Sequence, residues 1–251
     1  MKSLLAVFVL AATFSANAQV VESYSSNSVA DQAAKLMVEE PYEAPIGKIF
    51  DEEAYFRGEL PVNQYTNVIV VNKAAKGPEA QTVRLYTNRQ LMLTTKVSTG
   101  REDVEIVNPV KSLFRKIFNT KGTTQSHWRH TLRGYYGVTR VYDFDYKSGE
   151  NNFHMPYAVF FNDSHGLALH QVPPDLGGGE AAGIAALGHR ASSGCVRVSE
   201  AGIIQIRQAV LAADQGQVPS IDSKTGLQKV DDQGRPQFRN GWKSIVIVEE
   251  Y

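Results

Sequence analysis

The chain of 251 residues contains a single cysteine, Cys195, so no disulfide within the chain can hold its fold together. Stability has to come from a buried hydrophobic core, and the roughly 230 residues that follow a leader sequence suffice for one well-packed domain with extensions. Cys195 stands in segment 192–197, Ser-Ser-Gly-Cys-Val-Arg. Small residues before the thiol and an arginine two positions after it favour a reactive group on a loop, and the alternative is an inert buried cysteine.

The N-terminus predicts export. Residues 1–18 have the parts of a secretory signal peptide: a basic Lys2, an apolar run over residues 4–14 and an Ala-x-Ala site that ends at Ala18. The apolar run is too short to cross a bilayer, and no later segment is apolar enough to do so. We therefore expect cleavage after Ala18 and no transmembrane segment, and an exported chain without disulfides suits the periplasm.

The charge balance argues against two classes of partner. The chain has 26 Lys and Arg residues and 26 Asp and Glu residues, which gives a formal net charge of zero. No global field therefore steers the protein toward nucleic acid or anionic lipid.

Two segments interrupt or precede the predicted domain, which spans residues 64–251. Residues 19–63 are polar and predict an N-terminal arm or linker, with a short helix over 29–39. Residues 103–130 interrupt the strand pattern in the manner of an insertion, and their apolar spacing predicts a short amphipathic basic helix. That helix is expected to cover the sheet, or alternatively to contact an anionic envelope polymer or membrane.

The remaining pattern is mostly that of β-strands. Strands are predicted over residues 67–72, 83–86, 91–99, 135–145, 157–162, 167–170 and 244–249. A helix is predicted over 199–210 with Ser199 as N-cap, and residues 173–189 predict a Gly- and Ala-rich loop with one helical turn. The fold class is therefore mostly β with one or two helices (α+β), with the cysteine loop just before a helix.

A thiol nucleophile needs a base and an activating environment. His170 is favoured as the base because it ends a short strand in which it shares one face with Ala168, and His189 and His165 are alternatives. The following helix would lower the thiol pKa if its N-terminus points at the sulfur. The N–H groups of Gly194 and Cys195 are candidates to face a developing oxyanion.

A metal site is the competing constellation. His127 and His130 have a spacing found in metal sites, but His165 and His170 face opposite ways on a straight strand. The chain has no second cysteine and no His-Glu-x-x-His motif. We therefore expect no metal and no cofactor.

Several segments together resemble the YkuD-type L,D-transpeptidase catalytic domain of bacterial cell-wall enzymes. In that family a strand that ends in histidine precedes a loop with the motif Ser/Thr-His-Gly-Cys. The matching segments are 97–100, 131–136, 155–161, 167–170 and 191–197. The resemblance runs from about Thr66 to the final strand and implies a YkuD-like β-sandwich or barrel.

The resemblance implies roles for individual residues. It makes Cys195 the nucleophile, His170 the general base, Arg197 a substrate- or loop-positioning residue and Tyr157 a wall of the cleft. The order of histidine before cysteine is opposite to that of papain-like and NlpC-type peptidases. Three features depart from the family: Ser193 replaces its motif histidine, whose role is absent or falls to another residue such as His189; Gln171 replaces a usual glycine; and the loop between His170 and Ser192 is longer than usual.

The resemblance also implies a reaction on peptidoglycan stem peptides. Cys195 would attack the carbonyl of the third residue of a tetrapeptide stem and release the terminal D-alanine. An amine acceptor on another stem gives a 3–3 crosslink, and a lipoprotein lysine or a D-amino acid gives attachment instead. Water as acceptor gives an L,D-carboxypeptidase. A catalytically silent wall-binding module is a further hypothesis, and the retention of Cys195, His170 and Arg197 argues against it.

Overall fold

The computed structural model describes residues 43–106, 126–148, 152–176 and 178–251. They fall into two units, of which one contains residues 103–106 and 126–127 and the other residues 43–102 and 128–251. In the first unit, strand β4 (Val104–Ile106) pairs with β5 (Ser126–Trp128), whose last residue counts with the second unit. The helices predicted over 29–39 and within the 103–130 insertion lie outside the described residues.

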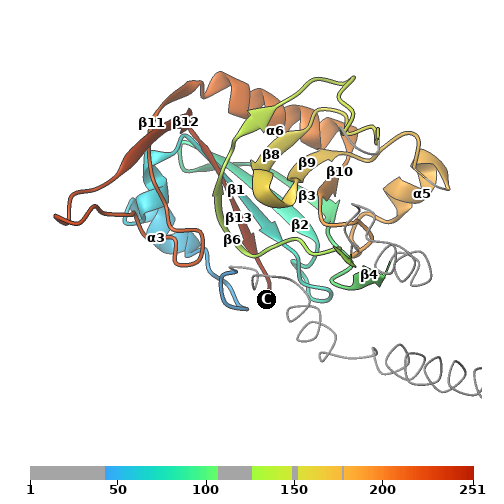
Figure 1. Cartoon of the computed structure of the whole chain (residues 1–251), viewed down its shortest axis with the longest axis horizontal. Helices are drawn as coiled ribbons and strands as arrows, with labels where there is room; N and C mark the ends of the chain where they lie inside the picture. Colours follow the sequence, from blue (N-terminus) through green and yellow to red (C-terminus); the bar gives the residue numbers. More distant parts are fainter. Residues whose placement is uncertain (1–42, 107–125, 149–151, 177) are drawn as a thin grey trace, which may run out of the picture. The chain divides into compact units, whose positions relative to one another are not determined.

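One nine-stranded sheet dominates the second unit (Figure 1). Its order is β6-β13-β1-β2-β3-β10-β9-β8-β7. The strands are β1 (Asn67–Asn72), β2 (Thr82–Thr87), β3 (Gln90–Ser98), β6 (Gly134–Gly137), β7 (Arg140–Val141), β8 (Val159–Asn162), β9 (Leu167–Gln171), β10 (Val196–Val198) and β13 (Ser244–Glu249). The sheet curls into a half-barrel, so that the rings of Tyr136 of β6 and Phe161 of β8 pack 5.7 Å apart in a tilted arrangement.

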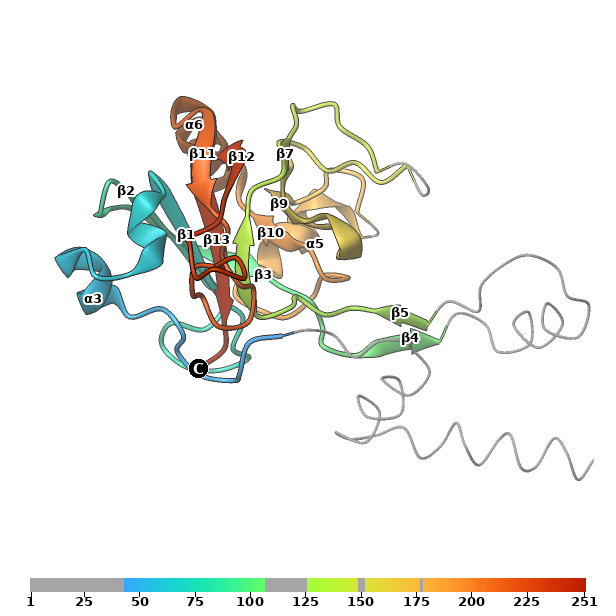
Figure 2. The ribbon, with the colours of Figure 1, turned by 60° about the vertical axis from the view of Figure 1, so that its left-hand side comes forward.

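Three helices accompany the sheet, which confirms the predicted mostly β class. They are α3 (Glu52–Arg57), α5 (Gly179–Ala185) and α6 (Glu200–Ala212). The chain also forms two short 3₁₀ turns, η1 (Pro61–Gln64) before β1 and η2 (Asp163–His165) between β8 and β9. Figure 2 shows α3 and α5 on opposite sides of this unit. A separate hairpin pairs β11 (Gln215–Pro219) with β12 (Phe238–Trp242), and neither α3 nor this hairpin was predicted from the sequence.

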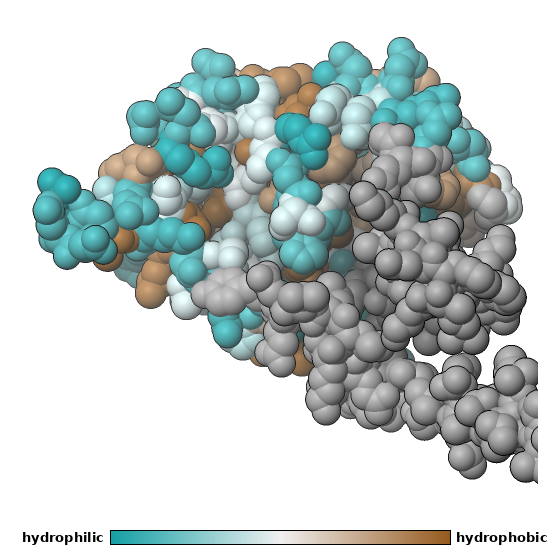
Figure 3. All heavy atoms as spheres, viewed as in Figure 1, coloured by the Kyte–Doolittle hydropathy of each residue, from teal (hydrophilic) through white to brown (hydrophobic). Residues whose placement is uncertain are grey.

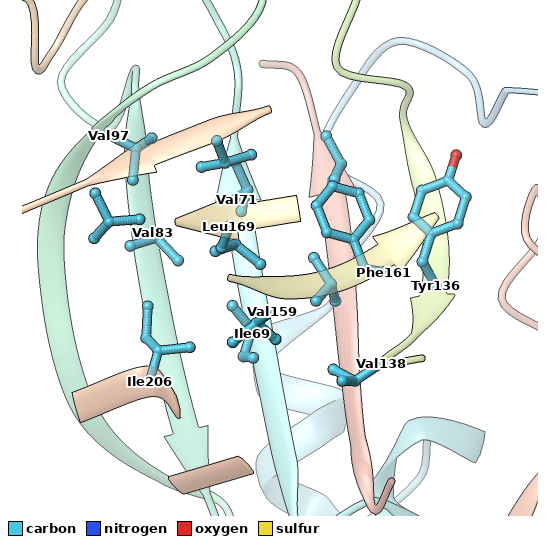
Figure 4. Close-up of a cluster of buried hydrophobic side chains, with 14 of the residues drawn as sticks. Ile69, Val71, Val83, Val97, Tyr136, Val138, Val159, Phe161, Leu169 and Ile206 are labelled. Atoms are coloured by element: carbon cyan, nitrogen blue, oxygen red, sulfur yellow. The ribbon is translucent and has the colours of Figure 1, made fainter. Parts of the chain in front are cut away.

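The concave face of the sheet holds the main core. Alternate residues of its strands point inward, because side chains of a strand alternate between the two faces. Figure 4 shows Ile69, Val83, Val159 and Leu169 from different strands meeting there with Ile206 of α6. Helix α6 begins where it was predicted, since the Ser199 side chain accepts a hydrogen bond from the Gly202 N–H at 3.3 Å.

The convex face of β13, β1 and β2 is covered by residues 43–64. Phe50 and Tyr55 are fully buried there, and they pack against Tyr86 of β2 at ring distances of 5.6 Å each. The sequence predicts an arm or linker over 19–63, but residues 43–63 belong to the same compact unit as the sheet. The apolar side chains of residues 43–63 are interspersed with polar ones, so hydropathy did not reveal that this segment packs on the sheet.

The described part of the chain contains no helix that is long and apolar enough to cross a membrane. On the face shown in Figure 3, polar side chains are interspersed with apolar ones.

Replacing Phe50 with alanine tests whether the segment before β1 is part of the domain. We expect Phe50→Ala to lower the free energy of unfolding by about 3–5 kcal/mol, the usual cost of removing a buried aromatic ring. Phe56→Ala is the matched control, because Phe56 of the same helix region is 46% exposed and its loss should cost clearly less. Urea unfolding of both variants measures the difference, and equal stabilities would contradict the packing described above.

Candidate active site

The parallel pairing of β9 and β10 brings the predicted catalytic residues together. Register places Val196 opposite Leu169 and Arg197 opposite His170. Leu169 and Val196 point into the main core. By alternation, His170 and Arg197 therefore point to the opposite, convex face, and Cys195 packs there against a smaller apolar cluster that includes Ala168.

A tight hydrogen-bonded loop presents Cys195. The Ser192 hydroxyl donates to the Cys195 carbonyl at 2.5 Å and accepts from the Gly194 N–H at 3.1 Å. Gly194 has φ +123°, and a Cβ at this position would lie 3.0 Å from the His130 carbonyl oxygen, so the loop requires glycine here. Of the two N–H groups predicted to face an oxyanion, that of Gly194 already has a partner.

The Cys195 thiol is half-buried and mainly in its protonated form at neutral pH. Its Sγ donates to the Gly166 carbonyl at 3.5 Å. Burial raises the pKa of the Cys195 thiol, while the Ala168 N–H and the Arg197 charge oppose that rise. Helix α6 follows the cysteine, but it packs on the concave face, and burial dominates the pKa of the thiol.

His170 has the tautomer and the charge that a general base needs. Its ring is 4% exposed, and Nδ1 lies 2.6 Å from the Gln171 carbonyl oxygen. A carbonyl can only accept, so Nδ1 carries the proton and Nε2 keeps its lone pair. Burial lowers the pKa of His170 to about 4, because the charged form loses hydration; the Gln171 bond raises that pKa and the Arg197 charge lowers it further.

The orienting contact to His170 uses the backbone of Gln171, so the glycine that is usual in the family is not required for it. The Gln171 side chain instead reaches Glu180 of α5 at 3.5 Å.

Arg197 supplies positive charge on the same face. It is half-buried, and its Nη1 donates to the Ala191 carbonyl at 3.4 Å. Burial is the largest cause that lowers the pKa of Arg197. The Cys195 charge raises that pKa, and the Arg101 charge lowers it further. Even a lowered arginine pKa leaves the guanidinium charged at neutral pH, so it favours the thiolate over the thiol.

The other predicted site residues differ in their placement. Ser193 is exposed beside the thiol, and His189 is exposed on the turn after α5. Tyr157 packs against the main core under Arg207 of α6, 6.0 Å from its ring, whereas Cys195 packs in the convex cluster. The alternative base His165 is exposed and contacts Ser164 and Asn162. The structure thus places Cys195, His170 and Arg197 on one face of the β9–β10 pair, and it places Tyr157 against the main core on the other face.

An aromatic pair beside the thiol was missed by sequence reasoning. Tyr142 and Tyr146 stack at 3.9 Å with an interplanar angle of 19°, and both pack in the convex cluster that contains Cys195. Burial is the largest cause that raises the pKa of the Tyr146 phenol, and the Cys195 charge adds to it. They lie in the irregular segment between β7 and β8. A strand was predicted over 135–145, but it is interrupted after Gly137 and ends at Val141 of β7, so alternation did not place Tyr142 and Tyr146.

A metal-binding cluster of three or more His, Cys, Asp or Glu side chains does not occur among residues 43–106, 126–148, 152–176 and 178–251. His130, one of the candidate ligands, places Nδ1 3.3 Å from a carboxylate oxygen of Glu102.

Comparison with known proteins identifies the family of the domain that carries these residues. Residues 66–221, more than half of the chain, match the family model of the YkuD L,D-transpeptidase catalytic domain. The chain belongs to this family. The matched L,D-transpeptidase catalytic domain contains Cys195, His170 and Arg197, and the chain spans about 60% of the length of the first two solved relatives that it matches. A search of curated protein sequences gave no match.

Solved structures give distant likenesses to this L,D-transpeptidase domain. An L,D-transpeptidase from Xylanimonas cellulosilytica is 16% identical with a TM-score of 0.38, and the match covers 74% of this chain and 61% of that one. An L,D-transpeptidase from Mycobacterium smegmatis is 13% identical with a TM-score of 0.38, over 74% and 59% of the two chains. The catalytic domain of the E. faecium L,D-transpeptidase is 13% identical with a TM-score of 0.35, over 72% and 95%. The assignment rests on the family model.

The pKa directions predict how alkylation of Cys195 depends on pH. Only the thiolate reacts, and its pKa is raised above the ordinary value of about 8.5, so the rate with iodoacetamide should climb through the range above that pH. His170 stays neutral between pH 5 and 9 and should add no step there. Because Cys195 is the only cysteine, total labelling reports this site alone. A reactive plateau below pH 7 would indicate a thiolate–imidazolium pair and contradict this description.

Proposed function

We propose that this protein is an exported peptidoglycan L,D-transpeptidase that acts through a Cys195 thioester. The observation that carries the proposal is the placement of Cys195, neutral His170 and Arg197 on one face of two adjacent parallel strands. A thiol, a base with a free lone pair and an orienting carbonyl form the arrangement that thiol acyl transfer requires. The signal sequence over residues 1–18 supports delivery to the periplasm, where stem peptides occur.

The first half-reaction forms the acyl-enzyme. The Cys195 sulfur bonds to the carbonyl carbon of the third stem residue as its proton moves to Nε2 of His170. The resulting imidazolium is held by the Gln171 carbonyl, which accepts from Nδ1. The carbon–nitrogen bond to D-alanine then breaks, and the leaving amine takes the proton from His170. The products are a thioester and free D-alanine, and His170 is neutral again.

The second half-reaction transfers the acyl group to an amine. The acceptor amine attacks the thioester carbonyl, His170 takes one of its protons, and the carbon–sulfur bond breaks. The departing Cys195 thiolate takes the proton from His170, so that both residues are neutral again. A diamino-acid side chain of a second stem as acceptor yields a 3–3 crosslink, and a lipoprotein lysine or a D-amino acid yields an attached product. Water in place of the amine would make the protein an L,D-carboxypeptidase. The chain uses no cofactor in either step.

Purified protein incubated with disaccharide-tetrapeptides tests the proposal. We expect 3–3 crosslinked dimers by mass spectrometry, and we expect loss of at least about 10³-fold of this activity in Cys195→Ala and in His170→Gln, as for nucleophile and base removal elsewhere. Tripeptide monomers alone would support the carboxypeptidase. A Cys195→Ala variant that processes the stems as fast as the wild type would remove the basis of the proposal.

Ser193 is proposed to act in the second half-reaction, because it is exposed at the position where the family carries a histidine. We expect Ser193→Ala to leave the rate of Cys195 acylation within about twofold, because the proposed first half-reaction uses Cys195 and His170 and not Ser193. Ser193→His, which restores an imidazole able to deprotonate an incoming amine, should raise the ratio of crosslinked to hydrolysed product. Acylation slowed more than tenfold in Ser193→Ala would place the residue in the first half-reaction instead.

A further inference from the structure

We propose that Thr131 is a positioning residue that orients the peptide bond between Gly194 and Cys195, so that the Cys195 N–H faces the oxyanion of the substrate. The proposal rests on the function proposed above for Cys195. Thr131 lies 63 residues before Gly194 and touches the nucleophile loop from within the protein.

The Thr131 hydroxyl has a fixed direction. The residue is fully buried, and its Oγ1 donates to the Gly194 carbonyl at 2.6 Å. The same Oγ1 accepts from the Gly100 N–H at 2.9 Å. Because the hydroxyl oxygen accepts the hydrogen bond from Gly100, the hydroxyl's own hydrogen is the one donated to the Gly194 carbonyl. Gly100 also forms an isolated parallel β-bridge with Ser192 at the start of the nucleophile loop. The backbone at Gly100 is therefore fixed to the loop through Ser192 as well as through Thr131.

Thr131 is itself anchored to a buried ion-pair network. Its N–H donates to a Glu102 carboxylate oxygen at 3.1 Å, and the other oxygen pairs with the Lys73 ammonium at 2.8 Å. Lys73 is completely buried, and Glu250 lies 3.7 Å from its charge. Truncation of such a network leaves a buried charge unpaired, so its members hold their positions strongly. Thr131 is therefore held in a fixed position from which its hydroxyl can orient the loop.

The orientation of Gly194 fixes that of the next N–H. In a trans peptide the N–H points opposite to the carbonyl of the same plane. Since the Gly194 carbonyl points inward to fully buried Thr131, the Cys195 N–H points outward. The Gly194 N–H already donates to Ser192, so the Cys195 N–H is the loop donor that remains to stabilise negative charge on the carbonyl oxygen.

Two reactions of the same thiol separate this role from a structural one. Imipenem acylates through an oxyanion: the sulfur bonds to the lactam carbonyl, the lactam carbon–nitrogen bond breaks and the nitrogen takes a proton. Iodoacetamide alkylates with loss of iodide and forms no oxyanion. We expect Thr131→Val, which keeps the shape and removes the hydroxyl, to slow acylation by about 10- to 100-fold and to leave alkylation unchanged. Thr131→Ser, which restores the hydroxyl, should recover the acylation rate.

Thr82→Val is the matched control, because Thr82 is also buried and donates a 2.6 Å hydrogen bond to the Glu79 carbonyl away from the site. It should change neither rate. Equal acylation rates for Thr131→Val and the wild type would overturn the proposal, and so would an equal loss in both reactions, which indicates a distorted loop. Failure of the proposed function gives a different result, namely muropeptide processing that survives in Cys195→Ala.

Discussion

The register between β9 and β10 is the constraint on which the site depends. Leu169 and Val196 face each other across this pair and are buried in the main core. A slip of one residue would turn these apolar side chains toward the convex face and drive His170 and Arg197 into the core. Hydrophobic burial on one face therefore fixes the positions of the polar residues on the other. The catalytic arrangement is a consequence of core packing as much as of the polar residues themselves.

Burial also determines the electrostatic state of the site. His170 is neutral and Cys195 is protonated because both lose hydration, and neither gains an oppositely charged partner strong enough to restore the ionised form. The resting pair is then a neutral thiol beside a neutral base on one sheet face. Under the proposed mechanism, charge develops when a substrate carbonyl is attacked, and the Arg197 guanidinium and backbone donors then stabilise it. This behaviour suits an enzyme whose thiol should remain unreactive until a stem peptide is bound.

Local sequence patterns predicted much of this structure. The β-branched run at 67–72, the N-cap at Ser199 and the alternation that puts Ala168 and His170 on one face follow from short-range rules. Those rules do not describe contacts between distant segments. The hydrogen bond from Thr131 to Gly194 spans 63 residues, and the Tyr142–Tyr146 pair lies on an irregular segment that begins where β7 ends, inside the strand predicted over 135–145. The expected cleft wall at Tyr157 came from family resemblance, and its placement depends on the path of that irregular segment.

Direct detection of the acyl-enzyme tests the central claim. Protein mixed with a tetrapeptide stem and quenched in acid within one turnover should gain the mass of the tripeptide acyl group, and proteolysis should place that mass on the peptide that contains Cys195. Hydroxylamine should remove it, as expected for a thioester. An adduct on another residue, or product formation with no adduct on Cys195 at any quench time, would contradict the account.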